Sequence, residues 1–118
     1  MNLPDDYIVA LLEQLEALAV DNAKAKATES AMVESRKMTK ARLMKAYTNS
    51  VDRPTIQKAE MYAYTHPEYK QAVEAMIAAQ EAASLANWML RIKEIEWESW
   101  RSLGASARVR EEHLKRGG

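Results

Sequence analysis

The sequence predicts an all-α protein, an elongated helical hairpin of two long helices with short connecting and terminal helices, which we expect to assemble as an oligomer. The first observation is composition, because Ala, Glu, Lys, Met and Leu are abundant among the 118 residues and there are only three Gly and three Pro. The second is that no Gly or Pro lies between Asp5 and Arg53, or between Glu68 and Leu103. The third is that apolar residues recur every three or four positions.

The first long helix is expected from about residue 5 to residue 47, as one helix or two collinear ones. Pro4, Asp5 and Asp6 are typical of a helix start, where acids meet the positive end of the dipole. Asn22 falls in register with the apolar stripe that follows, where it either fixes the alignment of helices or marks the end of packing. The stripe consists of Ile8, Leu11, Leu12, Leu15, Leu18 and Ala19.

A turn is predicted over residues 48–54, followed by a short helix that starts near Pro54 with Asp52 as its cap. This helix is expected to end at residues 65–67, where Thr65 and Glu68 have the spacing of a capping box for the next helix. The second long helix then continues to Gly104. We expect the chain to break there and to form a short terminal helix over residues 105–116.

The second long helix has two apolar faces in its C-terminal half. One face carries Leu85, Trp88, Ile92, Ile95 and Leu103, and the opposite face carries Leu90 and Trp97. A helix that is apolar on two sides usually packs between two partners, and in so small a chain one of them is expected to be another subunit. The predicted oligomer interface consists of Leu90, Trp97, Trp100 and Leu103.

Charge is sorted into blocks although the net charge is zero. Within a single helical domain over residues 1–118, we distinguish an acidic amphipathic arm (1–30), a basic segment (31–58), and the long helix with a terminal oligomerisation helix (67–118). Residues 1–21 hold five acids and no cation, whereas residues 24–58 hold nine cations and three acids. Each block is either a solvated helix face or a surface that pairs with the opposite charge, within or between subunits.

Several function classes are not expected. There is no Cys for disulfides or thiolate chemistry, no apolar run that would span a membrane, and no signal peptide, so we expect a cytoplasmic protein. His66 and His113 lack metal-ligand partners at helical spacing, and Glu94, Glu96 and Glu98 fan over different faces. With no phosphate-binding glycine loop either, we expect no enzyme activity, no cofactor and no metal.

The basic block Ser35–Val51 carries the candidate function, because it has five cations and no acid. Such a local field meets either phosphates or an acidic protein surface. Motifs for reading a double helix are absent, so sequence-independent binding to single strands fits better than base-specific readout. The predicted nucleic-acid-binding residues are Arg36, Lys37, Lys40, Arg42, Lys45 and Tyr47.

The chain resembles the UvsY-type recombination mediators of tailed phages over roughly residues 30–115. The likeness begins at residues 33–37, passes through Lys-Ala-Arg-Leu at residues 40–43, and continues with Lys-Ala-Glu-Met at residues 58–61. It ends with Arg101, Ser102 and Gly104, which are similar to a Ser-Arg-Gly element before a final helix. The first 30 residues match poorly, and the aromatic positions of the long helix differ from those of the family.

This resemblance implies a non-enzymatic, ring-like homo-oligomer in the host cytoplasm. Such a protein binds single-stranded DNA and helps to load a RecA-like recombinase onto strands covered by single-strand-binding protein. Lys40 and Arg42 are the DNA-binding residues that it carries over. The alternative is a phage-type helical structural, adaptor or inhibitor protein whose basic face binds another protein.

Overall fold

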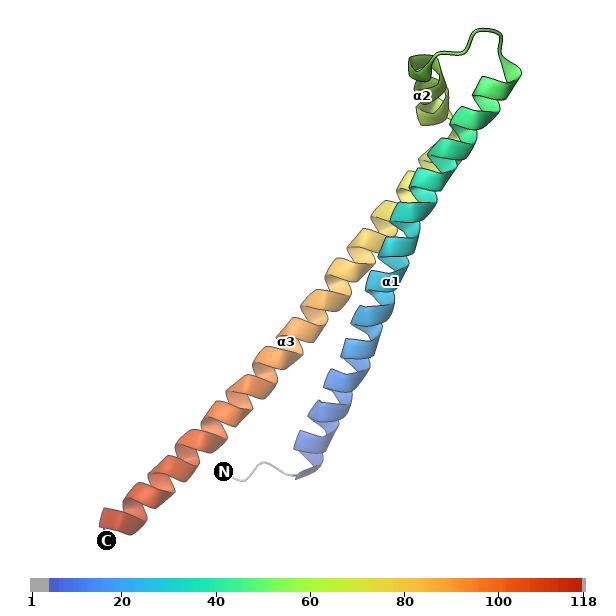
Figure 1. Cartoon of the computed structure of the whole chain (residues 1–118). Helices are drawn as coiled ribbons and strands as arrows, with labels where there is room; N and C mark the ends of the chain where they lie inside the picture. Colours follow the sequence, from blue (N-terminus) through green and yellow to red (C-terminus); the bar gives the residue numbers. More distant parts are fainter. Residues whose placement is uncertain (1–4, 118) are drawn as a thin grey trace. The chain divides into compact units, whose positions relative to one another are not determined.

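Three helices account for nearly all of the chain. The computed structural model describes residues 5–117, which form α1 (Asp5–Ser50), α2 (Ile56–Thr65) and α3 (Pro67–Gly117), with no strand among them (Figure 1). The predicted all-α class, with two long helices and a short connecting one, is confirmed. Pro4, expected in the first turn of α1, lies outside the described residues.

The turn after α1 is capped differently from the prediction. Arg53 adopts a positive φ of 55°, which reverses the chain after α1, and Thr55 in an extended conformation is the N-cap of α2. The Thr55 hydroxyl accepts a hydrogen bond from the backbone N–H of Lys58 at 3.2 Å. Asp52, which we expected to cap this helix, lies three positions too early to reach the first free N–H groups.

The junction between α2 and α3 consists of one extended residue, His66, with φ −77° and ψ 135°. Its Nδ1 accepts a hydrogen bond from the backbone N–H of Glu68, so His66 caps α3 and Pro67 occupies the first helical position. We expected Thr65 in this role. The Thr65 hydroxyl instead donates back to the carbonyl of Met61 within α2, because Thr65 is still helical.

The expected break at Gly104 does not occur, because α3 continues through it as one helix. Gly104 keeps a negative φ, and a Cβ built at this position would meet nothing within 4 Å. Glycine inside a helix costs only about 1 kcal/mol relative to alanine, which lowers helix stability without stopping the helix. The residues expected to form a separate terminal helix therefore belong to α3.

The chain divides into two units, which we name by their charge. The basic unit is Asn22–Leu85 and holds ten Lys and Arg against seven Asp and Glu. The acidic unit combines Met1–Asp21 with Ala86–Gly118 and holds seven Lys and Arg against ten Asp and Glu. The charge blocks of the sequence thus produce one unit of net charge +3 and one of −3.

The basic unit has a narrow core made mostly of alanine. The residues that are nearly inaccessible are Leu43 of α1, Ala59 and Ala63 of α2, and Ala79 and Ala83 of α3. Within α3, the buried or half-buried Tyr69, Ala72, Met76, Ala79 and Ala83 follow alternating intervals of three and four residues, and Val73 beside them is also half-buried. That spacing is the seam of a coiled coil, and small side chains allow the helices to approach closely.

Asn22 interrupts this apolar seam. It is the one polar residue of the described chain that is classed as buried, and its Oδ1 has no hydrogen-bond partner among the described residues. A buried polar group without a partner destabilises the folded state by about 1–3 kcal/mol. Its position in register with the stripe agrees with the sequence analysis, and it lies at the first residue of the basic unit.

The acidic unit is packed with larger side chains and buries less of them. Ile8, Leu15 and Leu18 of α1 are half-buried and Leu11 is buried, whereas Leu12, from the same predicted stripe, is 45% exposed. On α3, five of the half-buried positions recur at intervals of three and four residues, and Glu94 and Glu96 are half-buried beside them. The five positions are Ala86, Leu90, Lys93, Trp97 and Trp100.

Candidate nucleic-acid interface

Two cations of the predicted basic block meet two tyrosines in the basic unit. Lys40 Nζ donates a hydrogen bond to the Tyr64 hydroxyl at 2.7 Å and lies 4.7 Å from the centroid of the same ring. Arg36 Nη1 donates to the Tyr69 hydroxyl at 3.2 Å. The rings of Tyr64 and Tyr69 meet edge to face, with centroids 5.4 Å apart. We call Arg36, Lys40, Tyr64 and Tyr69 the cation–tyrosine cluster.

Three helices supply this cluster, since the cations stand on α1, Tyr64 on α2 and Tyr69 on α3. Arg36 and Lys40 are four residues apart, which places them on the same face of α1 one turn from each other. Tyr64 follows the buried Ala63, and Tyr69 lies in the first turn of α3. The caps at Thr55 and His66 set the paths of α2 and α3, so they also determine where the two rings lie.

The cluster keeps its positive charge, because its acceptors are neutral phenols. The hydrogen bond to Tyr64 raises the pKa of Lys40 above its ordinary value, so the ammonium stays protonated at neutral pH. Among the described residues, neither Arg36 nor Lys40 forms an ion pair with a carboxylate. Arg36 Nε is also inaccessible and without a partner in this part of the chain, which leaves one of its donors unused.

The other three predicted cations, Lys37, Arg42 and Lys45, are not hydrogen-bonded to tyrosines within the described chain. Arg42 pairs with Glu68 at the start of α3, and this guanidinium lowers the pKa of the Glu68 carboxyl below its ordinary value. Lys37 pairs with Glu34 one turn earlier on α1 at 3.5 Å. Lys45 is exposed and has no ion pair within residues 5–117. The five cations therefore divide into charges held by phenols, charges paired with acids, and one exposed charge.

Tyr47, predicted as an aromatic platform, belongs to a second group of rings. Its ring lies 5.3 Å from that of Tyr62 at a tilt of 34°, and Tyr62 in turn meets His66 at 5.5 Å. Tyr47 is half-buried, so Tyr62 is the outer ring of this pair. Tyr47 was predicted to bind nucleic acid together with Arg36 and Lys40, but its ring contacts this second group.

Sequence reasoning missed Tyr64 and Tyr69, although a signal for them was present. Four of the five tyrosines lie between residues 47 and 69, around the two turns. Because a turn reverses the chain, aromatic residues on both of its sides are brought together. The concentration of tyrosine beside a basic block could have suggested a composite site, whereas a single-helix view of α1 could not.

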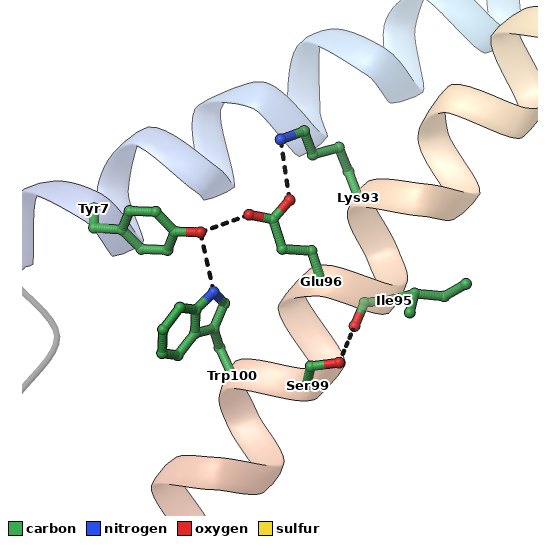
Figure 2. A network of polar contacts seen from close by, with 6 residues as sticks. All are labelled: Tyr7, Lys93, Ile95, Glu96, Ser99 and Trp100. Carbon is green, nitrogen blue, oxygen red and sulfur yellow. Dashed lines mark hydrogen bonds and ion pairs between the residues drawn. The ribbon is translucent and has the colours of Figure 1, made fainter. Parts of the chain in front are cut away.

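The acidic unit has its own polar network, shown in Figure 2. The Tyr7 hydroxyl donates to Glu96 Oε1 at 2.5 Å and accepts from Trp100 Nε1 at 3.0 Å, while Lys93 Nζ donates to Glu96 Oε2 at 3.0 Å (Figure 2). The hydrogen bond to Glu96 raises the pKa of Tyr7, and the same bond, followed by that from Lys93, lowers the pKa of Glu96. This clasp joins the first turn of α1 to α3.

The predicted oligomer interface separates into inward and outward residues. Leu90, Trp97 and Trp100 are half-buried on the seam of the acidic unit, and Leu103 is 61% exposed. The face opposite Leu90 and Trp97 is the exposed one. It carries Leu85, Trp88, Ile92 and Ile95, which are each about half exposed or more. The sequence identified both stripes of α3, and the structure places the second one at the surface.

No group of three or more His, Asp or Glu side chains that could hold a metal ion occurs in the described part of the chain. None of its helices is long and apolar enough to cross a membrane. Comparisons with protein-family models, with curated proteins and with solved structures gave no match to this chain. The proposed function therefore depends on the contacts of these residues and on the resemblance described from the sequence.

Proposed function

We propose that this chain is a non-enzymatic single-stranded DNA-binding protein that acts as a phage recombination mediator. The observation that carries the DNA-binding part is the cation–tyrosine cluster, where Arg36 and Lys40 are oriented by neutral phenols. Cations that are held in place but not neutralised are suited to phosphate, because no internal ion pair has to break first. Aromatic rings among such cations are typical of surfaces that bind unpaired strands.

The mediator part of the proposal comes from the resemblance to UvsY-type proteins. In that role the protein would act in the host cytoplasm, and its partners would be a RecA-like recombinase and single-strand-binding protein. The Lys-Ala-Arg-Leu run contributes Lys40 to the cluster and Arg42 to the adjacent ion pair with Glu68. The resemblance implies DNA binding by both residues, but Lys40 is hydrogen-bonded to a neutral phenol whereas Arg42 is paired with a carboxylate. We therefore expect Lys40 to contribute more than Arg42 to the affinity for single strands.

Self-association is part of the same proposal. The exposed stripe of Trp88, Ile92 and Ile95 in the acidic unit is an apolar face at helical spacing, and the exposure of such a face to water is unfavourable. We place the subunit interface on this stripe, in place of the half-buried Leu90, Trp97 and Trp100. Assembly would present several clusters to one strand, so that weak sites add up to a high overall affinity.

The test is fluorescence anisotropy with a labelled single-stranded oligonucleotide across a salt series. We expect Lys40→Ala to weaken binding about tenfold at low salt and to reduce the slope of log K against log salt by about 0.7, the value for one phosphate contact on a single strand. Lys26→Ala is the matched control, because Lys26 is an exposed cation of α1 in the same unit. Equal affinities for wild type, Lys40→Ala and Lys26→Ala would refute the proposed site.

The mediator role needs a separate assay, which measures recombinase loading onto a strand already coated with single-strand-binding protein. Wild-type protein should shorten the lag before strand exchange, and Lys40→Ala should not. Binding to the bare strand without any effect on loading would leave a DNA-binding protein with a different task.

A second candidate is a helical adaptor whose basic face binds an acidic protein. The observation that favours it is the pairing of Arg42 with Glu68 and of Lys37 with Glu34, because these cations already accept carboxylates as partners. Absence of binding to any single strand at low salt would favour this candidate over the first.

A further inference from the structure

The ring of Tyr64 lies beside the two cations and remains accessible. Tyr64 is 49% exposed even though its hydroxyl accepts from Lys40 and its ring contacts both Lys40 and Tyr69. The inward positions of α2 are the buried Ala59 and Ala63, so this ring is not needed to fill the core. The Tyr64 ring is therefore held at the surface by its contacts with Lys40 and Tyr69, where it is free to contact a ligand.

We propose that Tyr64 stacks on an unpaired base whose phosphate is held by Lys40 and Arg36, so that the cluster binds a nucleotide and not only a charge. This inference rests on the proposed function and deepens it, because it names the part of the strand that the ring contacts. Nucleobases stack on tyrosine rings whatever their sequence. In a duplex both faces of each base are covered by its neighbours, so a stacking site of this kind favours single strands.

Tyr69 is a positioning residue in this arrangement. It is half-buried, its hydroxyl accepts from Arg36, and its ring meets that of Tyr64 at an interplanar angle of 65°. Such edge-to-face pairs are favourable and directional, so Tyr69 limits the tilt of Tyr64. The Tyr69 hydroxyl thereby holds Arg36 and the Tyr64 hydroxyl holds Lys40, while part of the Tyr64 ring remains exposed.

The other tyrosines are less suited to this role. Tyr62 already contacts two rings, those of Tyr47 and His66, and within the described chain it forms no hydrogen bond or cation–π contact with a cation of the basic block. Tyr7 has its hydroxyl engaged on both sides by Glu96 and Trp100, next to a carboxylate that repels phosphate. Tyr64 alone among the five combines an exposed ring with a contact to a cation that has no ion pair in the described chain.

The experiment compares an oligothymidylate with an abasic oligonucleotide of the same length and phosphate number, by anisotropy at fixed low salt. Wild-type protein should bind the oligothymidylate about tenfold more tightly, the size expected for one stacked base. Tyr64→Leu should remove that preference. Its affinity for the abasic strand should equal that of Tyr64→Phe, because both variants lose the hydrogen bond to Lys40. Tyr64→Phe, which retains the ring and loses the hydroxyl, should keep the base preference.

Tyr62→Leu is the matched control, since it removes a tyrosine ring from the same helix and should leave the preference unchanged. Circular dichroism verifies that each variant is helical, and if Tyr64→Leu unfolds, Tyr64→Gln, which also removes the ring at this exposed position, takes its place. Equal wild-type affinity for both strands, with binding still dependent on Lys40, would overturn the stacking inference and preserve the proposed function. Failure of wild type to bind either strand would overturn both.

Discussion

The basic and acidic units both contain parts of α1 and α3, but these helices are packed differently in the two units. In the basic unit the seam is lined by small residues such as Ala79 and Ala83, and five of its residues are almost inaccessible. In the acidic unit only Leu11 reaches that level of burial among the described residues, and large apolar side chains lie at the surface of α3. Both units expose large apolar side chains, for example Met38 and Met61 in the basic unit and Trp88 in the acidic unit, so the difference lies in how much each unit buries between its helices.

The polar contacts differ in the same direction. The basic unit joins its three helices through Arg36, Lys40 and Arg42, each of which reaches a residue of α2 or α3. The acidic unit joins α1 to α3 through the clasp of Tyr7, Glu96 and Trp100. In the basic unit, cations donate hydrogen bonds to phenol hydroxyls. In the acidic unit, a phenol hydroxyl donates to a carboxylate and accepts from an indole.

The largest expected effect tests whether the buried residues of the basic unit stabilise its fold. Leu43→Ala should lower the free energy of unfolding by about 2–5 kcal/mol, because it removes a side chain that is only 3% exposed and leaves a cavity. Urea unfolding followed by circular dichroism measures this change. Met38→Ala, at a residue of α1 that is 70% exposed in the same unit, is the control and should change stability by less than about 0.5 kcal/mol. Equal losses would contradict the assignment of the core.

The second prediction concerns the exposed stripe of the acidic unit. Ile92→Asp should leave the helix content unchanged, because Ile92 is 48% exposed, and should dissociate the proposed oligomer by placing a charge in its proposed subunit interface. Light scattering across a concentration series measures the change in mass. Ile56→Asp is a matched control, since Ile56 is 74% exposed at the first position of α2, where an acid is tolerated. An oligomer that is unchanged by Ile92→Asp would move the interface elsewhere.

The smallest expected effect concerns the ion pair at the edge of the basic unit. Glu68→Gln releases Arg42 and removes a carboxylate near the proposed phosphate site, so affinity for single strands should rise about threefold, with a steeper salt dependence. Both partners are half-exposed, so the fold should tolerate the change. Glu34→Gln, which releases Lys37, is the control for loss of a negative charge alone.

A double-mutant cycle separates the two effects of Glu68. If Arg42 binds phosphate only after leaving Glu68, Arg42→Ala should cost more affinity in the Glu68→Gln background than in wild type. Additive changes would mean that Glu68 acts on the strand by simple repulsion. Anisotropy titrations of the four proteins at one salt concentration give the coupling.

The extent of the helices followed from the sequence, because breakers are rare and their effects are local. The stretch free of Gly and Pro after Asp5 became α1, and Pro67 began α3 as expected. The caps were harder to predict, because Asp52, Thr55, Thr65 and His66 are all able to cap and the choice depends on backbone angles. Gly104 misled the prediction, since a single glycine in a helix is a cost and not a stop.

The faces of α3 could not be assigned from the sequence. Both Leu90 with Trp97 and Ile92 with Ile95 repeat at helical spacing, and periodicity does not say which stripe meets α1. The candidate cations were found because charge blocks are visible along one helix. Their partners were not, because Tyr64 and Tyr69 are 24 and 33 positions away from Lys40 and Arg36, and only the two turns bring them close.

The distribution of aromatic residues makes the two units optically distinct. All three tryptophans, Trp88, Trp97 and Trp100, belong to the acidic unit, whereas four of the five tyrosines belong to the basic unit. Excitation at wavelengths that tyrosine does not absorb therefore gives emission from the acidic unit alone. If the cation–tyrosine cluster binds a single strand as proposed, a change in this emission during a titration would report a response of the acidic unit, so the native chain already carries its own probe for that unit.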